Sequence, residues 1–386
     1  MFVFGTKGDG MAAKMDSALL ARSDLGVLIS LLKSEGYAVI GPTARDGAVV
    51  YEEIESEKEL PVGLTDEQSG GKYRLVPSGD SAVFGYSTPV QGWKAHLSPA
   101  KQKLMTAEKA GDGFRVVAPA LPSQKMALLG ARACEIAAIR IQAKVFNNGV
   151  ANDPGYAARK DNALVIAVAC RKAGGTCFCV SQGTGPKADS GFDLRLTEII
   201  EGARHVFLIE SGSEKGSAIL AKLPSQPASE SEFKAAENQL KKVTSAMGRT
   251  IPVPEVTAPL LRQSLTHERW DEVAKRCLAC GNCTMVCPTC FCSTVEEVND
   301  LTGTKAERWR SWDSCFSIDY SYIHGGSIRI ETKSRYRQWI THKLSYWVEQ
   351  FGESGCVGCG RCITWCPVGI DITEEVRAIQ ATEKGR

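Results

Sequence analysis

The sequence predicts a mixed α/β N-terminal region with a mostly parallel sheet, followed by a mainly α-helical region that is rich in cysteine. Two observations lead to this prediction. Apolar runs typical of buried strands alternate with helical patterns over residues 111–225, and most of the 15 cysteines fall within residues 256–386. Strands that alternate with helices favour a parallel sheet with helices on its faces.

The N-terminal part, residues 1–110, is expected to be a mixed α+β region. A helical pattern over residues 17–36 leads into strand-like runs at residues 37–43 and 47–54, and turn-rich segments follow. These patterns do not define a particular fold.

Residues 111–225 are expected to form an α/β region. The expected buried strands are residues 114–121, 126–131, 162–170 and 205–211, and the expected helices are residues 134–146, 194–203 and 215–223. Neither a Gly-x-Gly-x-x-Gly loop nor a Walker-type loop follows any of these strands. The sequence therefore predicts no flavin or nucleotide site in this chain.

The remaining residues divide into a linker and a helical domain. Residues 226–255 are polar, with prolines at both ends of a charged helical pattern, and predict a linker or docking segment. Residues 256–386 are expected to be mainly helical outside their cysteine loops. One helical stripe of this region is expected to be core: Ile340, Leu344, Trp347, Val348 and Phe351.

Composition excludes several classes of protein. The chain has 386 residues and a formal net charge of +2, which gives no electrostatic reason to expect nucleic acid or an anionic membrane as a partner. Residues 1–16 lack the pattern of a signal peptide, and no apolar run approaches the roughly 18 residues of a membrane span. We expect a soluble, cytoplasmic protein, in which clustered cysteines favour metal ligation over disulfides.

Two stretches share one cysteine spacing. Both read Cys-x2-Cys-x2-Cys-x3-Cys-Pro, the run that binds 4Fe–4S clusters in bacterial ferredoxins, and in two-cluster proteins the fourth cysteine ligates the other cluster. We therefore predict a ferredoxin-like domain with two 4Fe–4S clusters and crossed ligation. Cluster 1 would take Cys277, Cys280, Cys283 and Cys366, and cluster 2 would take Cys287, Cys356, Cys359 and Cys362.

Zinc is the alternative metal for the Cys-x2-Cys pairs. It is disfavoured because zinc does not require third and fourth cysteines at these offsets, repeated twice and each time followed by a proline, Pro288 and Pro367. The basic residues beside the motifs would either favour the reduced clusters or be exposed surface charges: Lys275, Arg276 and Arg361.

Four cysteines in the α/β region predict a possible third site. Cys134 begins an expected helix, Cys170 ends an expected strand, and Cys177 and Cys179 lie in the following loop. Ligands gather at strand ends in such sheets, so these cysteines could hold a third 4Fe–4S cluster. The alternative is that they are buried thiols acting as small hydrophobic residues.

Three cysteines and the histidines are left without a predicted role. Cys290, Cys292 and Cys315 are expected to be core thiols rather than extra ligands. No Cys-x-His pairing of the Rieske kind is present, so the histidines are expected to be structural or exposed: His96, His205, His267, His324 and His342.

At these motifs the chain resembles a known family, the iron–sulfur beta subunits of soluble NAD(P)-linked nickel–iron hydrogenases of the sulfhydrogenase type. The same family contains an iron–sulfur subunit of anaerobic sulfite reductase. The resemblance covers nearly the whole chain, and it is carried by residues 36–51, 84–97, 133–139, 170–180, 277–292, 308–326, 334–347 and 355–372.

The resemblance implies a non-catalytic electron-transfer subunit of an oxidoreductase complex. Its implied partners are an FAD- and NAD(P)-binding flavoprotein subunit and the nickel–iron hydrogenase small and large subunits. This chain itself is expected to hold no flavin, nucleotide or nickel, and no catalytic residue is predicted. The alternatives are the iron–sulfur subunit of an anaerobic sulfite reductase and a thiol- or polysulfide-reducing subunit. A redox-sensing regulator is disfavoured because no basic DNA-binding element accompanies the clusters.

Overall fold

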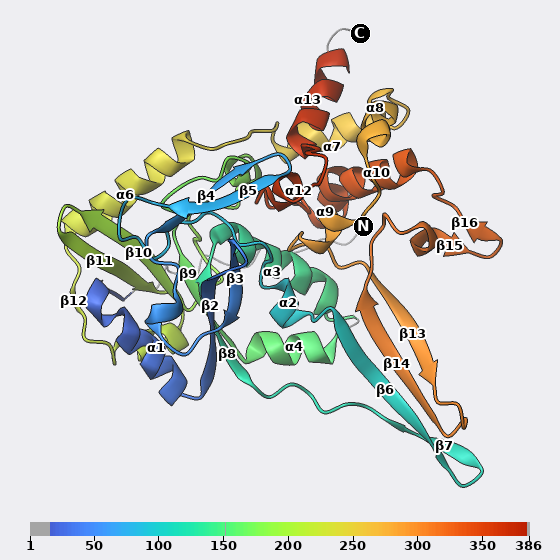
Figure 1. Ribbon diagram of the computed structural model, residues 1–386, viewed down its shortest axis with the longest axis horizontal. Helices are drawn as coiled ribbons and strands as arrows, with labels where there is room; N and C mark the ends of the chain where they lie inside the picture. The colour runs from blue at the N-terminus through green and yellow to red at the C-terminus, as the bar shows by residue number, and fades with distance from the viewer. Residues whose placement is uncertain (1–15, 151, 384–386) are drawn as a thin grey trace.

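The computed structural model describes residues 16–150 and 152–383 (Figure 1). Residues 1–15, over which the sequence predicts no signal peptide, lie outside the described residues. No helix of the described ranges is long and apolar enough to cross a membrane.

The largest element is an eight-stranded sheet. Its strand order is β12 (Gln226–Pro227), β1 (Ser17–Ala21), β11 (Arg204–Ser211), β10 (Leu194–Glu201), β9 (Ala163–Val168), β8 (Lys125–Ala131), β2 (Tyr37–Arg45) and β3 (Ala48–Glu53). Three of its seven adjacent strand pairs are parallel, and these join four consecutive strands, β10, β9, β8 and β2. The sheet is therefore mixed, where the sequence predicted a mostly parallel one.

Two tight turns account for antiparallel pairs in this sheet. β2 returns as β3 through Asp46 and Gly47, which have φ values of 50° and 76°, as a two-residue hairpin of the primed type requires. β10 returns as β11 through Gly202 and Ala203, with Gly202 at φ 59°. Strands joined by such short turns pair antiparallel, whereas β8 and β9 are joined through helices and run parallel.

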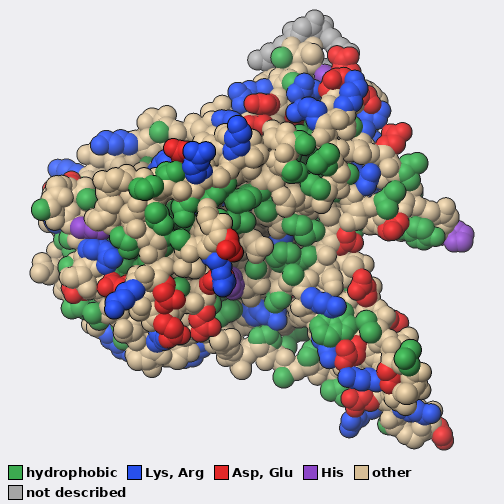
Figure 2. Space-filling view, viewed as in Figure 1, with side chains coloured by type: hydrophobic (Ala, Val, Ile, Leu, Met, Phe, Trp, Pro, Cys, Tyr) green, Lys and Arg blue, Asp and Glu red, His purple; other side chains and the backbone are tan. Residues whose placement is uncertain are grey.

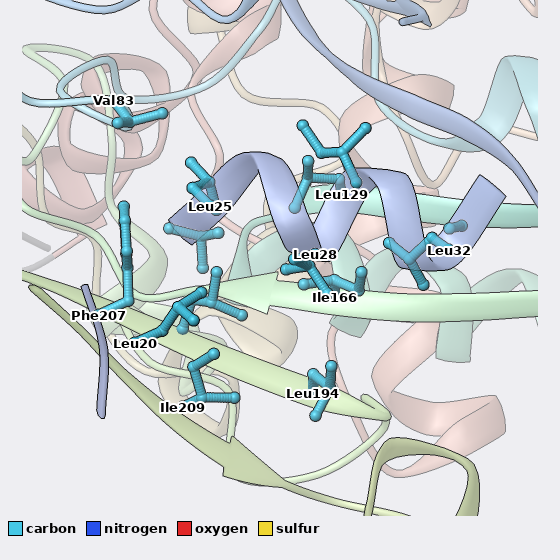
Figure 3. Close-up of a cluster of buried hydrophobic side chains, with 14 of the residues drawn as sticks. Leu20, Leu25, Leu28, Leu32, Val83, Leu129, Ile166, Leu194, Phe207 and Ile209 are labelled. Atoms are coloured by element: carbon cyan, nitrogen blue, oxygen red, sulfur yellow. The ribbon is translucent and has the colours of Figure 1, made fainter. Parts of the chain in front are cut away.

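Helices cover both faces of the sheet. α1 (Leu25–Ser34) and α5 (Glu214–Leu220) pack on one face, and α3 (Ala133–Phe146), α4 (Pro154–Asp161) and α6 (Glu230–Ser245) pack on the other. α6 belongs to the segment predicted as a linker, and its Ala236 packs on Ile199 and Leu208 of the sheet. Figure 3 shows ten labelled residues of the core under α1: Leu20, Leu25, Leu28, Leu32, Val83, Leu129, Ile166, Leu194, Phe207 and Ile209.

Residues 194–203, predicted as a helix, instead form strand β10 and the turn after it. The prediction was wrong because the charged residues of this segment have buried partners on other segments, which a local helical pattern does not show. Arg195 is buried and makes two bonds to Glu210 on the neighbouring strand, at 3.0 and 2.6 Å. Glu198 is buried too and accepts the backbone N–H groups of residues 83 and 84. Paired charges of this kind can lie inside a sheet.

The predicted division near residue 110 does not divide the sheet. Strands β1 to β3 come from residues 17–53, and they share the sheet with strands from residues 125–227. Residues 17–36, predicted as a helix, form β1, the short 3-10 helix η1 (Arg22–Asp24) and then α1. The 3-10 helix η2 (Glu57–Glu59) and a separate hairpin, β4 (Leu64–Ser69) and β5 (Lys72–Pro77), follow β3.

The C-terminal domain is built from short helices around the cysteine loops. Its fully buried Glu375 accepts hydrogen bonds from Arg269 at 2.5 Å and Arg276 at 2.6 Å, which joins its last helix to an earlier one. The helices are α7 (Pro254–Gln263), α8 (Arg269–Arg276), α9 (Asn282–Met285), α10 (Thr332–Thr341), the π-helix η5 (His342–Tyr346), α11 (Trp347–Phe351), α12 (Arg361–Thr364) and α13 (Ile372–Glu383).

A four-stranded antiparallel arm projects from the body (Figures 1 and 2). Its strand order is β13 (Ser293–Asn299), β14 (Lys305–Trp312), β6 (Lys101–Ala110) and β7 (Gly113–Val117). One expectation is wrong here, because residues 114–121 do not form a buried strand. Residues 256–386, expected to be mainly helical, also contribute the strands β13 and β14 to the arm. Phe114 and Val116 are exposed, since the arm satisfies its backbone hydrogen bonds through pairing without being covered.

Three small elements lie next to the arm in the chain. The helix α2 (Lys94–Leu97) precedes the arm strand β6. After the arm come the 3-10 helix η4 (Ile318–Ser321) and the hairpin of β15 (Tyr322–Ile323) and β16 (Gly326–Ser327).

We expect Phe207→Ala to lower the free energy of unfolding by about 3–5 kcal/mol, because it leaves a cavity in the core beside Phe84. Denaturant titration followed by circular dichroism measures this loss. Val116→Ala is the control, since Val116 is 61% exposed on the arm and its truncation should change the free energy by no more than about 0.5 kcal/mol. Equal effects of the two substitutions would contradict the placement of the core.

Candidate iron–sulfur centres

The two cysteine motifs fold in the same way. In each, the residue before the second cysteine has a positive φ, and its N–H donates to the Sγ of the first cysteine at 3.4 Å; these residues are Ala279 (50°) and Gly358 (62°). A left-handed glycine then starts the short helix that carries the third cysteine, Gly281 before α9 and Gly360 before α12. The equal spacing of the cysteines therefore produces two equal loops.

The fourth cysteine of each motif lies near the other motif. One group forms around Cys283, whose thiol interacts electrostatically with the other cysteines predicted for cluster 1: Cys277, Cys280 and Cys366. The interaction of this thiol with Cys287 of its own motif is weaker. The second forms around Cys362, whose thiol interacts with the others predicted for cluster 2: Cys287, Cys356 and Cys359. Cys283 and Cys362 also interact with each other, so the two groups adjoin. The structure brings these cysteines together, and their assignment as ligands stays a prediction.

The cluster 1 cysteines line a cavity of about 30 Å³, to which Cys362 of the second motif also contributes. Two aromatic residues on its wall, Tyr336 and Trp339, have a buried hydroxyl and a buried indole N–H without a hydrogen-bond partner among the described residues. Buried donors are almost always bonded, so these two indicate an acceptor within the cavity. The sulfur atoms of a cluster are such acceptors, and the four thiols fit its ligand set.

The arrangement of the cysteines also bears on the zinc alternative. Within residues 16–150 and 152–383, no group of three or more His, Cys, Asp or Glu side chains is arranged to hold a single metal ion. A zinc site needs its sulfur ligands at about 2.3 Å from one point. The cluster 1 cysteines instead line a cavity.

Burial raises the pKa of several cysteine thiols of the two motifs. It raises the pKa of Cys283 and of Cys362 well above the usual thiol value, and it raises the pKa of Cys356 to about 12. Neighbouring thiolates add to the effect, because like charges disfavour ionisation. Metal ligation must displace these protons, so metal binding and proton release are coupled.

Lys343 is a buried cation beside the cluster 2 cysteines. Its Nζ donates to the Sγ of Cys287 at 3.3 Å and to the Oγ1 of Thr289 at 2.8 Å. Burial acts to lower the pKa of Lys343, but the nearby thiolates outweigh it, so the pKa is raised well above its ordinary value. The charged ammonium offsets part of the negative charge that four thiolates bring into the interior.

The structure also brings together the four cysteines predicted for a third site. Cys134 lies in the first turn of α3, Cys170 follows β9, and Cys177 precedes Cys179, which begins the 3-10 helix η3 (Cys179–Gln182). The thiol of Cys179 interacts electrostatically with those of Cys170 and Cys177, and the thiol of Cys134 with that of Cys179. β8 and β9 are adjacent parallel strands, so their cysteine-bearing ends lie at one edge of the sheet.

The third group of cysteines adjoins cluster 2. Cys177 Sγ lies 3.8 Å from the carbonyl oxygen of Cys359. Three of the four thiols interact electrostatically with the thiol of Cys359: Cys134, Cys177 and Cys179. The backbone joins the two sites as well, because the N–H of Phe178 donates to the carbonyl of Gly358 at 2.8 Å.

Two buried arginines flank the third group. Arg132 is 0% exposed and Arg361 is 1% exposed, and among the described residues Arg132 Nε and Arg361 Nη1 have no hydrogen-bond partner. The buried carboxylate of Glu135 accepts from Arg361 Nη2 at 2.5 Å and offsets one of the two positive charges. An uncompensated buried cation is costly, so the remaining charge and the free donors suit an anionic group held by the cysteines.

Sequence reasoning missed Lys343, Arg132, Tyr336 and Trp339. A signal for Lys343 was present, because it lies three residues after Ile340 and four before Trp347, on the predicted apolar stripe. A lysine on a buried stripe indicates a buried partner for its charge.

The basic residues named from the sequence fall into two groups. Arg361 is buried in its ion pair with Glu135. Lys275 and Arg276 lie at the surface and pair with Glu272 and Glu375. These two are therefore exposed charges rather than neighbours enclosed with the clusters.

The fold and the cysteine loops define an iron–sulfur protein with a 4Fe-4S dicluster domain, and the model of the family with that description matches residues 276–370, which include both motifs. The chain is 30% identical over 345 residues to sulfhydrogenase 2 subunit beta of Pyrococcus furiosus, an alignment that covers 88% of this chain and 92% of that protein. The chain belongs to this family of sulfhydrogenase beta subunits, which confirms the resemblance seen in the sequence. No solved structure matches the chain.

Crossed ligation predicts which cysteine substitutions act alike. Cys366→Ser should remove the same electron paramagnetic resonance signal as Cys280→Ser, although Cys366 belongs to the other motif, because both cysteines would hold cluster 1. Cys287→Ser should remove the same signal as Cys359→Ser. Each pair of variants is the control for the other pair. The variants are reduced without oxygen, and their electron paramagnetic resonance spectra and iron contents are compared. If Cys366→Ser matched Cys359→Ser, each motif would hold its own cluster.

Proposed function

We propose that this chain is the electron-transfer subunit of a soluble, cytoplasmic hydrogenase complex. It relays electrons between a flavoprotein subunit that binds FAD and NAD(P)H and the nickel–iron hydrogenase small and large subunits. It carries out no substrate chemistry itself. The observation that carries this proposal is the row of adjoining cysteine sites.

The row leads from the interior to the surface. The third group adjoins cluster 2 through Cys359, and cluster 2 adjoins cluster 1 through Cys362 and Cys283. Cluster 1 includes Cys280, whose side chain is exposed. Redox centres that adjoin one another in this way suit electron relay, and the exposed end suits exchange with a partner subunit.

Bound 4Fe–4S clusters supply one-electron chemistry, and their potentials depend on charge, hydrogen bonds and solvent exposure. The residues of this chain control all three properties. The Lys343 ammonium adds positive charge beside Cys287, and backbone N–H groups donate to Cys277 and Cys356. The fully buried Ile363 helps to exclude water from the second motif.

The family supports the hydrogenase assignment, because the similar protein is named as subunit beta of sulfhydrogenase 2. A subunit named beta belongs with other subunits, in agreement with a chain that relays electrons. The identities of those subunits are part of this proposal.

Metal and cofactor analysis of the untagged complex, purified without oxygen from its native source, tests the assignment. We expect about one nickel per copy of this chain and a flavin in the complex, because the proposed partners carry both. Iron without nickel would overturn the hydrogenase assignment. An absorbance spectrum of sirohaem would then identify an anaerobic sulfite reductase.

The third cluster is part of the proposed relay and has a separate test. Cys177→Ser should lower iron and acid-labile sulfide by about four atoms each per chain, because one 4Fe–4S cluster would be lost. Ser181→Ala is the control, since Ser181 lies four residues after Cys177 in η3 and its hydroxyl accepts a hydrogen bond from the backbone N–H of Ile251. Unchanged iron in the Cys177→Ser chain would show that these four cysteines are buried thiols.

A further inference from the structure

Three cysteines that belong to none of the predicted clusters line one cavity. The cavity has a volume of about 20 Å³, against about 30 Å³ for the cavity lined by the cluster 1 cysteines. Its lining includes all three thiols together with an imidazole, an ammonium group and an indole: Cys290, Cys292, Cys315, His342, Lys343 and Trp347.

The thiols come from two loops that the arm joins. Cys292 directly precedes β13, and Cys315 follows β14, so pairing of these two strands brings both cysteines to the base of the arm. The Cys292 thiol interacts with the side chains of Cys315 and Tyr320. The Cys290 thiol in turn interacts with that of Cys287, so the cavity adjoins cluster 2.

The opposite wall is a π-helical turn. Residues His342–Tyr346 form η5, which interrupts the α-helical run between α10 and α11. Single π-turns are uncommon and are frequent at functional sites. Here the turn places the adjacent residues His342 and Lys343 on the same cavity. Among the described residues, neither ring nitrogen of His342 has a hydrogen-bond partner, which leaves this imidazole free to bind a metal.

The wall also carries an unpaired donor. Trp347 is 3% exposed, and its indole N–H has no hydrogen-bond partner among the described residues. Lys343 lies on the same wall, with its ammonium bonded to Cys287 and Thr289. The free buried donor of Trp347 suits an occupant rich in acceptors, as the inorganic sulfides and thiolates of a cluster are.

We propose that this cavity holds an additional iron–sulfur cluster, with Cys290, Cys292 and Cys315 as thiolate ligands and the imidazole of His342 as the fourth ligand. A zinc ion with three cysteines and one histidine would use the same types of ligand. The geometry favours the cluster, because among the described residues no three of these side chains are arranged to hold a single metal ion and they surround a cavity instead. The proposed cluster would lie beside Cys287 and so would adjoin cluster 2. It would not lie in line with the third group, cluster 2 and cluster 1.

The test compares metal content in variants of the full chain, purified without oxygen. The double substitution Cys292→Ser/Cys315→Ser should lower iron and acid-labile sulfide by about four atoms each per chain while the signals of clusters 1 and 2 remain. Ser314→Ala is the matched control. Ser314 is buried beside Cys315, accepts from Thr284 and bonds the N–H of Phe316, so its loss perturbs the same loop without removing a thiol. Iron should be unchanged in this control.

A second measurement needs no change to the cysteines. In the reduced protein, 15N-labelled histidine should give a nitrogen hyperfine coupling to one cluster signal, and His342→Gln should abolish that coupling. Unchanged iron in the double variant, zinc in place of iron and sulfide, or no histidine coupling would each overturn the proposed site. The ligands are distinct from those of the third group, so a loss of iron in the Cys177→Ser chain does not bear on this result.

Discussion

The arrangement of the cysteine sites depends on a close backbone contact between the second motif and the loop that carries Cys177 and Cys179. A Cβ on Gly358 would lie 2.6 Å from the carbonyl carbon of Phe178, and one on Gly360 would meet Thr176 at even shorter range. Only glycine permits such an approach, and both glycines also have positive φ. The contact holds the C-terminal domain on the strand ends of the sheet. The third group of cysteines thereby adjoins cluster 2 instead of forming a separate site.

The burial of charge follows from this contact. Arg361 enters the interface from the second motif and meets Glu135 of α3, while Arg132 approaches from the end of β8. Lys343 contributes a third buried cation from the π-turn. Burying cations is costly unless anions lie close by, and thiolate-ligated clusters are anionic. The same positive charges that stabilise bound clusters in the interior would also favour their reduced forms, so stability and redox function share one set of residues.

The N-terminal residues hold the C-terminal domain in a second way. The N–H of Gly71, at the tip of the β4–β5 hairpin, donates to the carbonyl of Ile363 at 3.1 Å, and Tyr73 stacks on Trp365 at a centroid distance of 5.1 Å. The arm adds a third connection, because β6 pairs with β14 from a distant part of the chain. Pairing of β13 with β14 also gathers Cys292 and Cys315. Segments far apart in sequence therefore contribute to each group of cysteines.

The sequence by itself determined the two ferredoxin-type motifs, because the spacing of the eight cysteines is local and dictates the loop that holds a cubane. It also determined the central strands β2, β8, β9 and β11, whose apolar runs carry their own signal. The tertiary structure decided the rest, since Arg195 and Glu198 look like exposed helix residues until their buried partners on other segments are known. The same holds for the arm, whose strands need partners from distant segments, as where Lys101 faces Ser311, and for the roles of Lys343 and His342. Local patterns encode which backbone conformation each segment prefers, but burial, pairing and charge compensation arise only when distant segments pack.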